Sequence, residues 1–139
     1  MKTLAVGVVA SAVMAVGAYS TAGSGDRVVT VTIEHSTFST GTIEVEPGES
    51  VTFEIQNNDP IDHEFLVGGK KMQRVHEEGT EGHHGDRPTE VSVPAGESRT
   101  TTIEFTESDE LSLTDPLIYG CHLPGHYDYG MRGEIEVSY

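Results

Sequence analysis

The sequence predicts an all-β protein, and two observations lead to this prediction. Short stretches alternate between apolar and polar residues, as in RVVTVTIEH at 27–35, which places Val29, Val31 and Ile33 on one face. Turn-forming residues separate such stretches, as at Pro47–Gly48. Seven to eight short strands with turns between them are typical of an antiparallel β-sandwich or barrel.

The expected strands follow this two-residue period along the chain. After residues 27–35, the stretch 42–59 (TIEVEPGESVTFEIQNND) reads as two strands joined by a Pro-Gly-Glu turn. PIDHEFLVG at 60–68 is the next strand, and 89–105 (TEVSVPAGESRTTTIEF) repeats the strand–turn–strand design. LIYGC at 117–121 and GEIEVSY at 133–139 are the last two strands.

One segment, residues 68–88 (GGKKMQRVHEEGTEGHHGDRP), departs from the strand pattern. It has few apolar residues and no alternation. Its first part, KKMQRVHEE, is compatible with a short helix that has Met72, Val75 and His76 on one side. The remainder reads as a polar loop.

The first residues have the layout of a secretory signal peptide. Lys2 precedes an apolar run at 4–18, and small residues follow it. This run of about fifteen residues is shorter than the roughly 20 that span a bilayer. We therefore expect a signal peptide at 1–22 with cleavage near 18–22, a linker at 23–27 and one domain at 28–139. The mature protein would be exported (periplasmic, extracellular or on the outer face of the cell membrane) and not integral to a membrane.

The charge restricts the partners. The 139 residues contain 8 Lys and Arg against 23 Asp and Glu, a formal net charge of −15. This balance argues against nucleic acid and anionic lipid as partners. It suits a cationic redox partner protein or a high-salt habitat, and it equally suits a solvated surface that keeps a small monomer soluble.

The single cysteine lies in an unusual setting. Cys121 begins the segment CHLPGHYDYGM, in which His126 and Met131 follow at intervals of five residues. A lone thiol cannot form a disulfide within its own chain, and it is a liability in an oxidising compartment unless it is buried or bound. In a straight strand five residues span roughly 16–17 Å, so one metal ion is shared only if the chain turns back, as Pro124–Gly125 allows.

A second candidate ligand lies upstream. In PIDHEFLVG the alternation places His63 on an apolar face with Phe65 and Val67. Taken alone, a histidine in such a position is more often a hydrogen-bonded core residue, and a lone buried cysteine is more often an inert apolar residue. His122 points to the face opposite Cys121 and is the poorer ligand candidate.

The combined donors favour copper. One thiolate, imidazoles and a weak thioether are the ligands of blue-copper electron-transfer sites. Zinc is the main competitor, but its structural sites prefer more cysteines or a paired histidine spacing.

The segments YGCHLPGHYDYGMRGEIEV and DHEF resemble the cupredoxins, the small type 1 blue copper proteins such as rusticyanin, plastocyanin and azurin. The resemblance covers residues 28–139. It implies a Greek-key β-sandwich and one type 1 copper; the implied ligands are His63, Cys121, His126 and axial Met131. It also implies an apolar patch for electron transfer, formed here by Leu123, Pro124 and Tyr127. Glu64 departs from the Asn or Ser that many relatives have after the first histidine.

These observations give two functional hypotheses. The first is an exported electron carrier that cycles between Cu(II) and Cu(I). The second is a protein for copper storage, delivery or resistance, in which His76, His83 and His84 form a second metal site. We do not expect an enzyme, because copper oxidases and reductases need further copper centres and larger assemblies than 139 residues offer.

Overall fold

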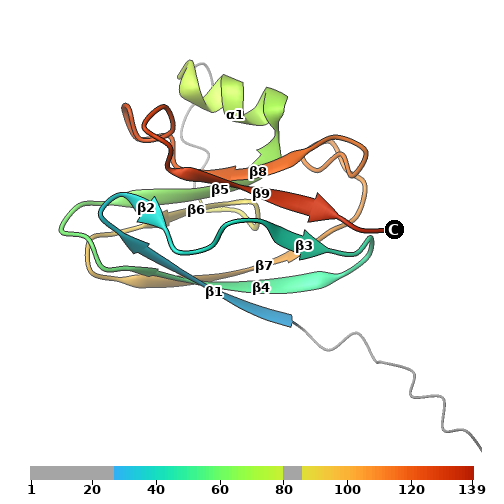
Figure 1. Ribbon diagram of the computed structural model, residues 1–139, viewed down its shortest axis with the longest axis horizontal. Helices are drawn as coiled ribbons and strands as arrows, with labels where there is room; N and C mark the ends of the chain where they lie inside the picture. The colour runs from blue at the N-terminus through green and yellow to red at the C-terminus, as the bar shows by residue number, and fades with distance from the viewer. Residues whose placement is uncertain (1–26, 80–85) are drawn as a thin grey trace, which may run out of the picture.

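The computed structural model describes residues 27–79 and 86–139, and it places them in two packed β-sheets and one helix (Figure 1). The first sheet has the strand order β2-β1-β4-β7 and the second has the order β3-β9-β8-β5-β6. The strands are β1 (Arg27–Glu34), β2 (Thr37–Phe38), β3 (Ile43–Val45), β4 (Ser50–Asn57), β5 (His63–Gly69), β6 (Glu90–Val93), β7 (Ser98–Glu104), β8 (Leu117–Gly120) and β9 (Arg132–Val137). The expected all-β sandwich is confirmed.

The connections differ from simple hairpins. The Pro47–Gly48 turn joins β3 and β4, which lie in opposite sheets. The turn at 94–96 likewise joins β6 of one sheet to β7 of the other. The pairs β1–β4 and β3–β9 are parallel, whereas the other paired strands are antiparallel. Both sheets therefore contain parallel and antiparallel pairs. The expected sandwich was antiparallel, because alternation identifies strands but does not identify their neighbours.

The core lies between the two sheets and follows from the alternation. Val31 and Ile33 of β1, Val51, Phe53 and Ile55 of β4, and Phe65 and Val67 of β5 are completely or almost completely buried. At one end of this core, Cys121 and Met131 belong to the same apolar cluster. Residues of opposite ends of the chain therefore meet inside one rigid sandwich.

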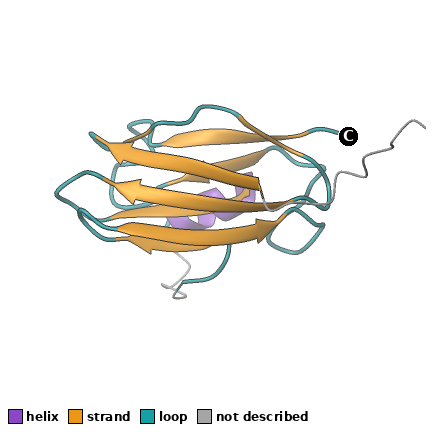
Figure 2. Cartoon of the chain, turned by 90° about the horizontal axis from the view of Figure 1, so that it is seen from below, coloured by secondary structure: helices purple, strands orange, loops and turns teal. Residues whose placement is uncertain are grey.

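The short helix predicted at 70–78 is present as α1 (Lys70–Glu77). It covers the outer face of the second sheet (Figure 1), and in Figure 2, which is seen from below, it lies behind the strands. For this reason β5 is buried on both faces, from His63 to Gly68. Gln73 is the buried residue of the helix, and the predicted side of Met72, Val75 and His76 is partly buried.

One strand, β2, was not predicted, and the predicted signal peptide cannot be compared with the structure. β2 comprises only two residues, too few to show a two-residue period. The predicted signal peptide and nearly all of the linker lie outside the described residues. Within residues 27–79 and 86–139, no helix has the length and apolar character needed to span a membrane.

Candidate metal centre

His63 begins β5, and the preceding turn is held by a buried side chain. The amide nitrogen of Asn57 donates hydrogen bonds to the carbonyl oxygens of Ile61, at 2.8 Å, and of Val93, at 3.0 Å. These bonds connect the end of β4 to β6 and hold the chain that enters β5. The imidazole of His63 is 1% exposed and faces the core, as the alternation predicted.

Cys121 directly follows β8, which lies beside β5 in the same sheet. Its side chain is fully buried. The backbone N–H of Glu64 donates to Sγ of Cys121 at 3.3 Å. The sulfur is therefore positioned by the strand that also carries His63, 58 residues earlier in the chain.

The segment after Cys121 turns back, as the sequence predicted. Gly125 has a φ of 83°, a conformation that residues other than glycine rarely adopt. The N–H of His126 donates to the carbonyl of Leu123 at 2.9 Å, and the N–H of Met131 donates to that of His126 at 3.0 Å. The N–H of Cys121 then donates to the carbonyl of Met131 at 3.1 Å, which closes the loop onto its own first residue.

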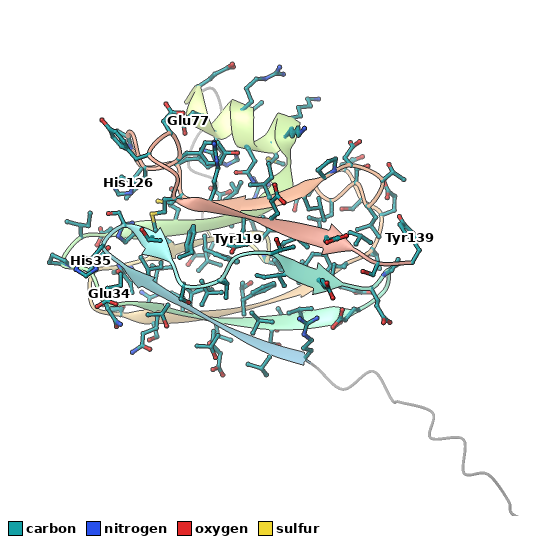
Figure 3. All side chains as sticks on the ribbon, viewed as in Figure 1. Glu34, His35, Glu77, Tyr119, His126 and Tyr139 are labelled. Atoms are coloured by element: carbon teal, nitrogen blue, oxygen red, sulfur yellow. The ribbon has the colours of Figure 1, made fainter. Side chains whose placement is uncertain are left out.

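Three donor atoms meet at this end of the sandwich. Sγ of Cys121 lies 3.9 Å from Nδ1 of His63 and 3.5 Å from Nδ1 of His126. All three donor atoms lie within 4.8 Å of one another, and this is the only such group of three His, Cys, Asp or Glu side chains among the described residues. Figure 3 shows His126 at the edge of the sandwich, beside yellow sulfur atoms.

The spacing of these atoms fits a single metal ion. Ligand bonds of about 2.0–2.3 Å to a common centre separate neighbouring nitrogen and sulfur donors by roughly 3.4–3.8 Å. The distance from Sγ to His126, 3.5 Å, lies in that range, and the distance to His63, 3.9 Å, lies just above it. Two imidazoles and one thiolate suit copper, which accepts both donor types in both of its oxidation states.

Met131 ends the loop that carries two of the donors. It is 1% exposed, and its backbone is bonded to both Cys121 and His126. The loop therefore brings its backbone next to these two residues. Its role as the fourth ligand stays a prediction.

Burial controls the protonation of the metal-free site. It raises the pKa of the Cys121 thiol to about 11, although N–H groups of Glu64 and Leu123 act in the opposite direction. Burial also lowers the pKa of His126, which favours its neutral form. A metal ion that binds here must therefore displace the proton of a thiol but meets an imidazole with a free lone pair.

This raised pKa predicts how the stability of the metal-free protein depends on pH. The ordinary thiol pKa is 9.0 and the folded value is about 11, so the unfolded chain loses its proton first. The stabilisation is complete below pH 9 and is lost as the pH rises towards 11, by about 2–3 kcal/mol. We expect the free energy of unfolding of wild type, relative to Cys121→Ser, to fall by this amount in denaturant titrations across that range. A constant difference would contradict the prediction.

His122 faces away from Cys121, as predicted, but it is not an exposed neighbour. Its side chain is 2% exposed. Its Nδ1 lies 2.8 Å from Oε2 of Glu77, and its Nε2 lies 2.6 Å from Oε1 of Gln73. Tyr127 stacks on the imidazole with ring centroids 4.5 Å apart. Sequence reasoning missed Gln73 and Glu77, whose only signal was the helical spacing of four residues.

The other predicted site residues are more dispersed. Pro124 is exposed, Leu123 packs against the core, and Tyr127 lies between His122 and the guanidinium of Arg132. His76 belongs to α1 and its side chain is 7% exposed; its Nδ1 lies 3.1 Å from the carbonyl oxygen of Met72 and its Nε2 lies 3.4 Å from Oε1 of Glu90. His83 and His84 lie outside the described residues, so the second metal site stays a prediction.

Glu64 contacts the sulfur through its backbone. This bond comes from the N–H, so it is separate from the side-chain hydrogen bond that Asn or Ser makes in many relatives. The side chain of Glu64 lies on the face of β5 opposite His63, and the residue is 8% exposed. Its negative charge contributes to the raised pKa of Cys121.

Solved structures of blue copper proteins have a similar fold. The auracyanin of Roseiflexus castenholzii aligns with a TM-score of 0.63, at 19% identity, over 84% of this chain and all of that chain. Auracyanin A of Chloroflexus aurantiacus, described as a "blue" copper protein, gives a TM-score of 0.57 at 18% identity, over 82% of this chain and 100% of that chain. These likenesses establish the fold.

Comparisons of sequence assign the chain to a family. A copper-resistant cuproprotein, CopI, of Rubrivivax gelatinosus is 32% identical over 104 residues, 72% of this chain, and the alignment spans 59% of that protein's length. The CopI of Pseudomonas aeruginosa is 28% identical over 89% of this chain and 83% of its own. The model of the cupredoxin-like domain family matches residues 7–82, more than half of the chain. The chain belongs to the family of cupredoxin-like domains.

Proposed function

We propose that the chain is an exported type 1 copper protein that carries electrons, with one copper cycling between Cu(II) and Cu(I). One observation carries this proposal: two imidazole nitrogens lie close to one thiol sulfur. Nδ1 of His126 is 3.5 Å and Nδ1 of His63 is 3.9 Å from Sγ of Cys121. A β-strand holds His63, and the loop after β8 holds the other two residues. His63, Cys121 and His126 would hold the copper, with Met131 as the axial ligand. The copper supplies one-electron chemistry.

The chain contributes rigidity to that chemistry. The sulfur is held by the Glu64 N–H, and the loop is closed by the bond between Cys121 and Met131. A site that does not rearrange between oxidation states transfers electrons with little reorganisation. His63 is buried, whereas His126 is only partly buried, so electrons would enter and leave on the side of His126.

The surface beside His126 would be the docking surface for a redox partner. Leu123, Pro124 and Tyr127 come from the same loop, and Tyr129 is 92% exposed next to them in the chain. The net charge of −15 would attract a cationic partner protein. An exported location, a monomeric state and the absence of enzymatic activity belong to the same proposal.

A role in copper resistance is the second candidate. It is favoured by the relatives from Rubrivivax gelatinosus and Pseudomonas aeruginosa, which are copper-resistant cuproproteins by name. In this role the copper would be cargo, and His76, His83 and His84 would provide a further site. Among the described residues, His76 is already engaged by the Met72 carbonyl and lies beside Glu90.

A copper titration separates these two functions. Metal-free protein receives Cu(II) while visible and paramagnetic-resonance spectra are recorded, and the loaded protein then goes through cycles of reduction and oxidation with a Cu(I) chelator present. We expect one intensely blue equivalent, bleached by one electron and recovered on oxidation. A colourless wild-type complex would rule out a type 1 site.

The opposite results identify the cargo role. A second, colourless equivalent that disappears in the variant with both His83→Ala and His84→Ala would favour storage or delivery. Loss of copper to the chelator in the first reduction would favour it as well, because an electron carrier must retain its metal in both oxidation states.

A further inference from the structure

A buried carboxylate lies directly behind the predicted ligand His63. Asp59 is in the turn between β4 and β5, four residues before His63, and is 7% exposed. Its Oδ2 lies 2.8 Å from Nε2 of His63. The two ring nitrogens of His63 therefore have different neighbours, because Nδ1 lies 3.9 Å from the Cys121 sulfur.

The carboxylate is fixed in this position by backbone donors. The N–H of His35 donates to Oδ1 at 2.6 Å, and the N–H of Ser36 donates to Oδ2 at 2.7 Å. Both residues have left-handed φ angles, 53° and 52°, which turn these two N–H groups towards one point. In addition, the N–H of Asp59 donates to Oδ1 of Asn57 at 2.9 Å. The first sheet thus supplies the support for a carboxylate that acts on the second.

The hydrogen bonds also define which ring nitrogen of His63 carries the proton. The two oxygens of Asp59 accept the N–H groups of His35 and Ser36, and Oδ2 also lies 2.8 Å from Nε2 of His63. A carboxylate oxygen in such a cluster of donors accepts a hydrogen bond from the ring. Nε2 of His63 therefore carries the proton, which leaves the lone pair on Nδ1, the nitrogen that faces the sulfur.

We propose that Asp59 is a positioning residue of the metal centre, which presents Nδ1 of His63 to the copper and stabilises Cu(II) relative to Cu(I). This inference rests on the proposed function, because it requires copper at His63. A carboxylate that shares the proton of a ligating imidazole fixes the orientation of the ring and increases its basicity. A fixed negative charge behind a buried ligand also favours the ion of higher charge.

A purely structural role is the alternative to be tested. Asp59 anchors the turn at 35–36, so any substitution would cost stability. A structural role alone would lower the stability of the metal-free and loaded protein equally. It would leave the relative affinity for the two copper ions, and hence the reduction potential, unchanged.

The test compares Asp59→Asn with Asp62→Asn. Asparagine has nearly the same shape as aspartate but has no charge and cannot accept all of the hydrogen bonds. Asp62 is the matched control because it also lies next to His63 in the chain, is exposed, and accepts the N–H of Ala95 at 2.9 Å rather than a ring nitrogen. Dissociation constants for Cu(II) and Cu(I) and the reduction potential are measured for both variants and wild type.

We expect Asp59→Asn to weaken Cu(II) binding by about 10–100-fold, with a smaller loss for Cu(I). Each tenfold difference between the two losses raises the potential by about 59 mV. Asp62→Asn should change neither quantity measurably. Equal losses for the two ions, or an unchanged potential, would overturn the inference.

A second measurement does not depend on the folding of the variant. In the diamagnetic Cu(I) form of the wild type, nitrogen NMR of His63 should show a protonated Nε2 whose proton exchanges slowly with water. A proton on Nδ1, or rapid exchange at Nε2, would overturn the inference. A wild type that forms no blue complex would overturn the proposed function, whereas a blue wild type with an unaffected Asp59→Asn variant would overturn this inference alone.

Discussion

Cys121→Ser is expected to abolish the intense blue colour of the copper-loaded protein completely. The colour would arise from charge transfer between the thiolate and Cu(II), and a serine hydroxyl cannot supply it. The nearest donors that remain, His63 and His126, would bind Cu(II) weakly and give the pale spectrum of nitrogen and oxygen ligation. Visible absorption and paramagnetic resonance of the wild type and the variant measure this change.

The fold should survive this substitution, and that is what makes the result specific. Serine is slightly smaller than cysteine, and its oxygen can accept the N–H of Glu64 that now points at the sulfur. Circular dichroism of the metal-free proteins should therefore be the same. His35→Asn is the matched control, because His35 is exposed, has a left-handed φ that asparagine tolerates, and should leave the colour intact. A blue Cys121→Ser protein would contradict the assignment of Cys121.

Gly133→Ala should have the largest effect on stability among the Gly→Ala substitutions in the described strands, because the added carbon would meet the closest neighbour there. Gly133 of β9 lies opposite Tyr119 of β8. A Cβ at Gly133 would be 2.1 Å from both Cζ and Oη of Tyr119. That ring is fully buried, and its hydroxyl donates to the carbonyl of Gly41 at 2.6 Å, so it has no free space into which it can move.

The cost combines overpacking with disturbed hydrogen bonds. Overpacking costs about 1–3 kcal/mol, and a buried hydroxyl that loses its partner adds about 1–3 kcal/mol. We expect a decrease of about 3 kcal/mol in the free energy of unfolding, or roughly 10 °C in Tm. Thermal and denaturant unfolding of the metal-free protein measure it.

Two further variants identify the cause. Gly41→Ala is the control, because no atom lies within 4 Å of the added carbon, and its stability should remain near that of wild type. In a Tyr119→Leu background, Gly133→Ala should cost much less, since the atoms with which it clashes are removed. An equal cost in both backgrounds would show that Tyr119 is not responsible.

Local sequence patterns were sufficient to predict the type of fold and to select His63, Cys121 and His126 as candidate donors. Alternation in stretches such as 27–35 identified the strands, since every second side chain of a half-buried strand faces the core. The same alternation placed His63 inward, and Pro124–Gly125 indicated that the chain turns back to bring His126 towards Cys121. These conclusions were available because each depends on residues that are close together in the chain.

Features that depend on residues far apart in the chain became visible only in the three-dimensional fold. It put β3 and β4 in different sheets and paired β1 with β4 in parallel, because pairing depends on contacts that no local pattern records. It also showed that His122 is buried against Gln73 and Glu77 of α1 rather than exposed. Asp59 could be assigned to His63 only from the geometry, since a short polar residue in a turn has many ordinary uses. Its orientation is set by the backbone N–H groups of His35 and Ser36, in the turn between β1 and β2.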